Sequence, residues 1–185
     1  MRLDMLDPPY DPADAERLAR LLPEGAEPVH LMRQLLRAHP DLTEALMILP
    51  GFLHGSGSRL DPRTRELVVA RTLARCGNDY EWGIHLAPAA DVARFSAEER
   101  SALATGAADD PVWDRHDQVL LHAVDELYDS ETLSDATFTA LLDHLDGGQA
   151  LELAAAAGWY RATSLLSNTL QPPLEDGPRL PTPAG

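Results

Sequence analysis

The chain has 185 residues, the size of one domain, and its 30 acidic and 15 basic residues give a formal net charge of −15. A surface this negative repels nucleic-acid phosphates and anionic lipid, and the absence of lysine excludes Schiff-base chemistry, lysine-bound pyridoxal phosphate and a P-loop lysine. A single cysteine, Cys76, excludes an intrachain disulfide, a cysteine-rich zinc site and a two-cysteine redox pair within one chain.

The sequence shows no pattern of export or membrane insertion. Residues 1–9 lack the apolar stretch of a signal peptide, and the longest apolar run, residues 153–160, is far shorter than the roughly 20 residues that a membrane span needs. We therefore expect a cytoplasmic protein that acts on a small molecule and has no nucleic-acid or membrane partner.

Proline marks both ends of the chain. Residues 1–12 contain Pro8, Pro9 and Pro12 and are expected to form an irregular N-terminal arm. Residues 172–185 form a proline-rich tail that cannot continue a helix and is expected to be extended or mobile. Residues 13–171 between them contain no convincing internal repeat and are interpreted as one helical domain.

Apolar residues recur at helical spacing through most of this domain. Asp61 is a candidate N-cap before a proline, residues 51–58 are rich in glycine and serine and predict a loop, and Pro88 is expected to bend its helix. We expect an all-α fold of about seven to nine helices, within these approximate ranges: 14–22, 29–38, 41–50, 62–75, 78–92, 96–106, 114–128, 134–145 and 149–170.

The last of these helices has no polar face between residues 153 and 160. Such a helix is either central in its own domain or buried against another subunit. A 20.2 kDa domain with this helix has more apolar surface than one small core readily covers, so we expect a homo-oligomer.

Glu81 and His85 lie four residues apart on a predicted helix, which places their side chains on one face within contact distance. A carboxylate beside an imidazole is an acid–base pair, because it favours the imidazolium or fixes the tautomer while histidine moves protons near neutral pH. Tyr80 and Trp82 add bulk that could exclude water from a small substrate pocket. The alternatives are structural: Glu81 fits the third position of a capping box that begins at Asn78, and Trp82 fits a core position.

Glu66 lies in the middle of a predicted helix among apolar residues, with Arg63 and Arg65 nearby. A carboxylate at the edge of an apolar face needs either a partner or a raised pKa. Glu66 is therefore a second acid–base candidate, and a paired surface carboxylate is the alternative.

Three strings of residues carry a family resemblance. They are Arg63-Thr64-Arg65-Glu66-Leu67-Val68-Val69, Tyr80-Glu81-Trp82-Gly83-Ile84-His85 and Gly158-Trp159-Tyr160-Arg161, with Asn168 near the end. From about residue 29 to 170 the chain resembles the carboxymuconolactone decarboxylase family, which includes the alkyl-hydroperoxidase D-like proteins. The resemblance implies an alkyl-hydroperoxidase D-like helical bundle that assembles as a dimer, trimer or hexamer.

The thiol pair of the family's peroxidase members is missing. Those members carry Cys-x-x-Cys-x-x-x-His with an upstream glutamate, and by count from His85 the cysteine positions here hold Asn78 and Glu81 while the upstream acid is Glu66. Peroxide reduction requires a thiolate, so we do not expect hydroperoxidase activity. Cys76 lacks a resolving partner, and residual peroxidase activity through Cys76 alone is kept as an alternative.

The decarboxylase branch is similar to this chain in having the acids and the histidine without thiols. The resemblance implies that His85 is the general acid/base, that Glu81 is its orienting partner or a second proton carrier, and that Glu66 is a relay acid. Arg71 and Arg161 are candidates to bind a substrate carboxylate, with structural ion pairs as the alternative.

We therefore expect a carboxymuconolactone decarboxylase-like lyase or isomerase. It would use proton-transfer chemistry (decarboxylation, isomerisation or elimination) on a small organic acid or conjugated carbonyl compound, without a cofactor. A metal site is not expected, because the chain lacks His-Glu-x-x-His and has Glu-x-x-His once, at Glu27–His30, where di-iron sites need two. A non-catalytic ligand-binding protein on the same scaffold is the alternative from another class.

Overall fold

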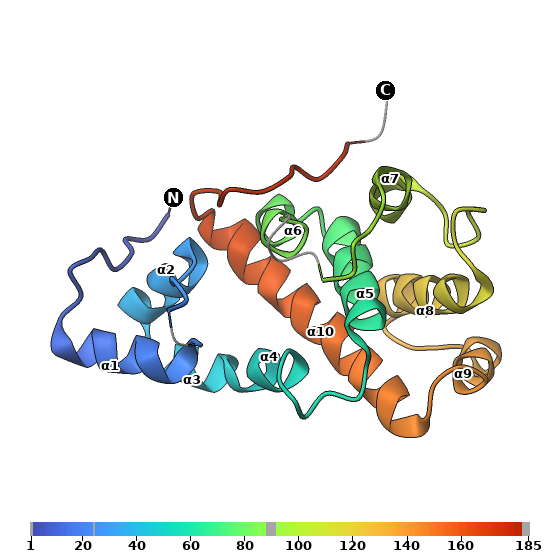
Figure 1. Cartoon of the computed structure of the whole chain (residues 1–185), viewed down its shortest axis with the longest axis horizontal. Coiled ribbons are helices and arrows are strands. Elements are labelled where there is room, and N and C mark those ends of the chain that lie inside the picture. Colours follow the sequence, from blue (N-terminus) through green and yellow to red (C-terminus); the bar gives the residue numbers. More distant parts are fainter. Residues whose placement is uncertain (1, 24, 88–91, 183–185) are drawn as a thin grey trace.

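The computed structural model describes residues 2–23, 25–87 and 92–182, and every regular element in these ranges is a helix. The all-α prediction is confirmed. Figure 1 shows α10 crossing the molecule diagonally, with α1–α3 on one side of it and α5, α8 and α9 on the other. The helices are α1 (Pro12–Leu21), α2 (His30–Ala38), α3 (Pro40–Leu46), α4 (Ile48–Leu53), α5 (Pro62–Arg75), α6 (Asp79–His85), α7 (Ala97–Thr105), α8 (Arg115–Ser130), α9 (Asp135–Leu142) and α10 (Gly147–Leu170).

Helix α5 forms the centre of the fold because its neighbours cover nearly its whole circumference. Residues 64–73 are all buried, and the helix packs against α6, α7, α8 and α10. Its first turn is capped by Asp61, whose carboxylate accepts hydrogen bonds from the backbone N–H groups of Arg63 and Thr64. A helix fixed on every side gives a rigid base for the side chains that it carries, Glu66 among them.

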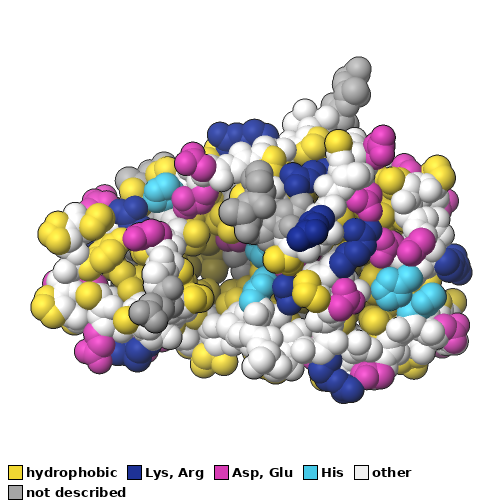
Figure 2. Space-filling view, in the orientation of Figure 1, with side chains coloured by type: hydrophobic (Ala, Val, Ile, Leu, Met, Phe, Trp, Pro, Cys, Tyr) yellow, Lys and Arg dark blue, Asp and Glu magenta, His cyan; other side chains and the backbone are white. Residues whose placement is uncertain are grey.

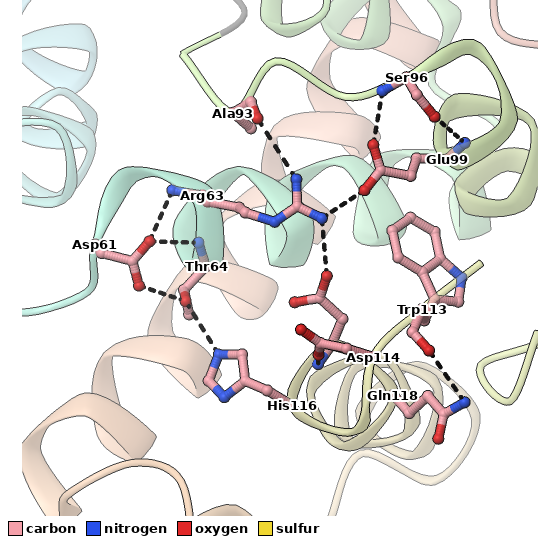
Figure 3. A network of polar contacts seen from close by, with 11 residues as sticks. Asp61, Arg63, Thr64, Ala93, Ser96, Glu99, Trp113, Asp114, His116 and Gln118 are labelled. Carbon is pink, nitrogen blue, oxygen red and sulfur yellow. Dashed lines mark hydrogen bonds and ion pairs between the residues drawn. The ribbon is translucent and has the colours of Figure 1, made fainter. Parts of the chain in front are cut away.

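Arg63 joins the start of α5 to α7 and α8 (Figure 3). Its Nη2 atom lies 2.6 Å from Glu99 Oε1 and 2.9 Å from Asp117 Oδ2. Glu99 also accepts a hydrogen bond from the backbone N–H of Ser96, which completes the capping box of α7. Both carboxylates are paired with the same guanidinium and join three helices, so we assign the cluster to the framework of the fold.

The N-terminal arm is packed against the domain. The backbone N–H of Arg2 donates to the carbonyl of Leu170 at 3.0 Å, and that of Leu6 donates to the carbonyl of Arg33 at 3.2 Å. The arm thereby contributes to a small second core between α1 and α2, whose buried members are Leu6, Leu18, Met32 and Leu36.

The described part of the C-terminal tail, residues 172–182, contains no helix and lies against α6 (Figure 1). The backbone N–H of Leu180 donates to Asp79 Oδ1 at 2.7 Å. Gly177 lies so close to the backbone of Gly83 that any side chain at position 177 would overlap it. The glycine therefore permits the tail to cross α6.

Several element boundaries differ from the prediction. The helix expected after Asp41 is divided into α3 and α4, and residues 51–53 are helical where a loop was predicted. Pro50 falls in the first turn of α4, where a missing N–H costs no intrahelical hydrogen bond. Helix α6 ends at His85, and the bend predicted at Pro88 lies outside the described residues.

No helix in the described part of the chain is long and apolar enough to cross a membrane.

Candidate active site

Glu66 and His85 form the centre of the candidate site. The middle of α5 faces the last turn of α6, which brings Glu66 Oε2 within 2.8 Å of His85 Nδ1. The two side chains are only 4% and 12% exposed, so water screens the pair weakly. Arg65 Nε lies 3.1 Å from the other oxygen of Glu66. Glu66 is thus a buried, partnered acid and not a surface carboxylate.

Glu81 approaches the other nitrogen of the same imidazole. Its backbone N–H donates to Asn78 Oδ1 at 3.1 Å, but the reciprocal capping-box bond is not needed, because the N–H of Asn78 already donates to the carbonyl of Leu73 at 2.9 Å. The Glu81 carboxylate is therefore not tied to the helix start, and its Oε2 lies 4.0 Å from His85 Nε2. One acid lies at each nitrogen of His85.

Two further residues, His54 and Tyr160, complete the cluster and were missed by the sequence analysis. His54 follows α4, with its Nε2 2.7 Å from the hydroxyl of Tyr160 and its Nδ1 3.9 Å from Glu66 Oε1. The Tyr160 ring meets the His85 ring edge-on, with centroids 4.9 Å apart. His54 fell in a predicted loop, and Tyr160 belongs to a string that supported the resemblance without a role of its own.

Burial and charge separate the proton affinities of these groups. Burial disfavours both charges of the Glu66–His85 pair, but their hydrogen bond and mutual attraction outweigh it, so the pKa of Glu66 is lowered and the pKa of His85 is raised. Burial raises the pKa of Glu81, and the charge of His85 only partly opposes this. Burial, assisted by the charge of His85, lowers the pKa of His54 to about 4. The lowered pKa of Glu66 favours its carboxylate, the raised pKa of His85 favours its imidazolium, and a pKa of about 4 leaves His54 neutral at neutral pH.

Glu81 and Tyr160 line a pocket of about 130 Å³ between α2, α3, α4 and α10. Most of its other walls are apolar, for example Leu31, Met32 and Trp159. Figure 2 shows a hollow lined by hydrophobic side chains between the part of the molecule built from α1–α3 and the rest. Of the three predicted acid–base residues, Glu66, Glu81 and His85, only Glu81 is among the described residues that line the pocket. His85 lies next to Glu81, and Glu66 lies on the other side of His85.

The two arginines predicted to bind a substrate carboxylate lie elsewhere. Arg71 makes a two-point ion pair with Asp125, at 2.8 and 2.7 Å, and its Nη1 donates to carbonyls at the end of α7. Arg161 lies over the ring of Tyr128, 5.3 Å from its centroid, and 3.6 Å from Glu131. Neither arginine is among the described residues that line the pocket beside Glu81, and a substrate-binding role for either stays a prediction.

The aromatic residues of α6 also point away from the acid–base cluster. The hydroxyl of Tyr80 donates to Glu175 at 2.8 Å and accepts the N–H of Leu31 at 2.9 Å, so it connects α6 to the tail and to α2. Trp82 is 1% exposed and belongs to the main hydrophobic core. Both residues support the fold around the site, and neither lies among the described residues of the pocket wall.

Cys76 caps the C-terminal end of α5 and is half-buried. Burial raises the pKa of its thiol above the ordinary value, despite a hydrogen bond with Ser164 and the nearby arginine charges. A protonated thiol is a weak nucleophile, which agrees with the expectation against peroxide chemistry. Within the described ranges, no group of three or more histidine, cysteine, aspartate or glutamate side chains is arranged to hold a metal ion.

Comparisons with known proteins agree with this architecture. Residues 40–125, which include Glu66, Glu81 and His85, match the model of the carboxymuconolactone decarboxylase family. A solved structure from Agrobacterium tumefaciens, described as a protein of unknown function and a candidate AhpD antioxidant defence protein, has a TM-score of 0.66 at 19% identity and covers 76% of this chain and 96% of its own.

Two further structures, both described as uncharacterized peroxidase-related proteins, resemble the chain over most of its length. The one from Ralstonia eutropha, an alkylhydroperoxidase AhpD core, has a TM-score of 0.69 at 16% identity and covers 95% of this chain and 92% of its own. The one from a Silicibacter species has a TM-score of 0.63 at 15% identity and covers 93% and 89%. Identities this low show a shared fold alone, and no curated protein matches the chain.

Proposed function

We propose that this chain, whose residues 40–125 match the model of the carboxymuconolactone decarboxylase family, is an enzyme that transfers protons to and from a small molecule bound beside Glu81. The reaction is a decarboxylation, isomerisation or elimination on a small organic acid or a conjugated carbonyl compound, without a cofactor. One observation carries the proposal: the imidazole of His85 lies between Glu66, at 2.8 Å, and Glu81, at 4.0 Å, and Glu81 reaches the pocket.

In this arrangement each acid has a different task. Glu66 accepts the Nδ1–H of His85, which orients the ring and leaves Nε2 facing Glu81 to gain or lose a proton. Because the carboxylate of Glu66 also stabilises the imidazolium, His85 holds its proton to a higher pH than an ordinary histidine.

Glu81 is the group that meets the substrate. Its raised pKa keeps it protonated at pH values where an ordinary glutamate is ionised, so it can donate to a developing carbanion or dienolate in the pocket. His85 Nε2 can then return a proton to Glu81. The apolar walls strengthen these charge interactions because they exclude water.

The experiment is a proton-shift assay on a probe of suitable size. Isomerisation of cyclohex-3-en-1-one to the conjugated cyclohex-2-en-1-one moves one proton from the carbon next to the carbonyl to the far end of the double bond. Its progress is read from the ultraviolet absorbance of the product. General acid–base catalysis typically contributes about 10²- to 10⁴-fold, so His85→Ala should lower the rate at least about 100-fold.

The matched control is His122→Ala, because His122 is an exposed histidine on α8. It should keep the wild-type rate, and circular dichroism should show that both variants remain folded. Equal rates for wild type and His85→Ala, or a wild-type chain that accelerates neither this probe nor a β,γ-unsaturated acid, would contradict the proposal.

The chain is also proposed to form a homo-oligomer. Leu151, Gly158 and Leu165 are exposed and follow one another at seven-residue spacing, which places them on one side of α10. Leu151 and Leu165 are 71% and 68% exposed, so this side offers apolar surface that a second copy could cover. The expected cytoplasmic location stays a prediction.

A further inference from the structure

Thr163 is a polar residue of the pocket wall whose hydroxyl has no hydrogen-bond partner. It lies on α10, one turn after Tyr160, and only 7% of its surface is exposed. Its Oγ1 atom is buried and makes no hydrogen bond to any described residue. A buried hydroxyl without a partner is destabilising, and threonine in a helix readily adopts two rotamers that exchange the hydroxyl with the methyl group. Thr163 can therefore turn its hydroxyl to an acceptor in the pocket.

The pocket offers hydrogen bonds but no positive charge. Its polar side chains, among the described residues, are Glu81, Tyr160 and Thr163, and the rest of the wall is aliphatic, methionine, proline and tryptophan surface. Burial raises the pKa of Glu81 and that of Tyr160, which favours their neutral, proton-donating forms. A carboxylate placed here would lose its hydration without gaining a cation.

Neither Arg65 nor Arg71 supplies that cation from its present position. Arg65 is paired with Glu66 at 3.1 Å, and Arg71 is paired with Asp125. The pocket's volume of about 130 Å³ is also small, comparable to the cavity of about 150 Å³ that accepts benzene in another protein. The absence of a cation from the pocket wall and the small volume of the pocket both favour a small, uncharged ligand.

We infer that this pocket binds a small, uncharged, mostly apolar carbonyl compound, about one six-membered ring in size, whose oxygen accepts a hydrogen bond from Thr163. The inference rests on the proposed function, and it narrows the substrate to a conjugated carbonyl compound in preference to an organic acid. Thr163 is then the residue that positions the substrate, and Glu81 exchanges the proton.

The chemistry that follows needs no oxidant or reductant. The reaction starts from the ionised form of Glu81, whose raised pKa makes its carboxylate a stronger base than that of an ordinary glutamate. In the isomer with the unconjugated double bond, one C–H bond breaks next to the carbonyl and its proton passes to the Glu81 carboxylate. The electron pair of that bond shifts toward the carbonyl oxygen at Thr163, which gives a dienolate. A proton from Glu81 then forms a new C–H bond at the far carbon, so substrate and product are isomers.

The test measures the equilibrium binding of three probes to the full chain. Binding is monitored by ligand-detected NMR titration. The probes are cyclohex-2-en-1-one, its 3-carboxylate (3-oxocyclohex-1-ene-1-carboxylate) and the methyl ester of that carboxylate, which keeps the bulk of the carboxylate and removes its charge. We expect the ketone to bind, and the carboxylate to bind at least about 100-fold more weakly than the ester. Equal affinity for the carboxylate and the ester, or no binding of the ketone, would overturn the inference.

The role of Thr163 is tested by Thr163→Val, which keeps the shape of the side chain and removes the hydroxyl. Loss of one neutral hydrogen bond should weaken binding of the ketone about 3- to 10-fold, and Thr163→Ser should restore it. The unliganded Thr163→Val protein should melt at the same or a higher temperature than wild type, because it no longer buries an unpaired hydroxyl. The control is Thr139→Val, at an exposed position on α9. Unchanged ketone affinity in Thr163→Val would refute the assignment.

Binding requires no proton transfer, so this series separates the inference from the proposed function. If turnover depends on His85 but the carboxylate binds as well as its ester, the inference alone is wrong. If the ketone binds through Thr163 but turnover is indifferent to His85, the proposed function alone is wrong.

Discussion

The contact between Glu66 and His85 should set the pKa of His85, and this pKa can be measured without any substrate. Replacement of Glu66 by glutamine keeps the size of the side chain and an oxygen for His85 Nδ1, but removes the charge 2.8 Å from the ring. Burial then dominates, so the pKa of His85 should fall from above its ordinary value of 6.5 to below it.

The same substitution has a stability cost that depends on pH. A hydrogen bond to a charged group contributes about 1.5–3 kcal/mol and a neutral one about 0.5–1.5 kcal/mol, so Glu66→Gln should cost about 1–2 kcal/mol near pH 6. Stability from the raised pKa of His85 is present below 6.5 and is lost as pH rises through the folded value. Stability from the lowered pKa of Glu66 is present above 4.5 and is lost as pH falls through its folded value. The difference between wild type and variant should therefore peak between these two limits.

The assay combines NMR titration of the His85 ring protons with urea unfolding at several pH values. Glu16→Gln is the control, because its side chain is 76% exposed and its removal should change stability by less than about 0.5 kcal/mol. An unchanged or higher pKa of His85 in Glu66→Gln, or an unfolding difference that is the same at every pH, would refute the electrostatic account of the pair.

Three other predictions follow from the structure. Arg71→Met should lower the free energy of unfolding by about 3–5 kcal/mol, because it removes the two-point ion pair and leaves Asp125 with Arg75 alone, 3.8 Å away, whereas the exposed Arg20→Met should cost less than about 1 kcal/mol; comparable losses would show that Arg71 is not a framework residue. Cys76→Ser should consume hydrogen peroxide at the same rate as wild type, and a loss of peroxide consumption would revive the thiol mechanism. Sedimentation of the wild type should show an oligomer that Leu165→Glu dissociates, and a wild-type monomer at tens of micromolar would contradict the proposed assembly.

Local signals in the sequence predicted much of the helical framework. Asp61 and the proline after it predict a helix over residues 62–75, and α5 has those bounds. The helix predicted over residues 96–106 is likewise present as α7, Ala97–Thr105, which Ser96 and Glu99 cap. Caps and prolines act over a few residues, so they can be recognised without knowledge of the fold.

The roles of several side chains depend on partners that are far away in the sequence. Arg71 is a predicted substrate-binding residue, and the fold places Asp125, 54 residues later, against its guanidinium. Tyr80 faces Glu175, which lies 95 residues further along the chain. His54 joins the cluster through Tyr160, 106 residues away, and no local pattern links the two. A side chain's role depends on such contacts, which only the folded chain displays.

The central claim is that Glu81 carries protons between the buried His85 and the pocket. The most direct measurement is the isomerisation rate of Glu81→Gln, a variant that keeps the side-chain shape but cannot hold a transferable proton. We predict that it still binds cyclohex-2-en-1-one within about threefold of wild type and isomerises cyclohex-3-en-1-one at least about 100-fold more slowly. A Glu81→Gln protein that binds the ketone and isomerises at the wild-type rate would contradict the account.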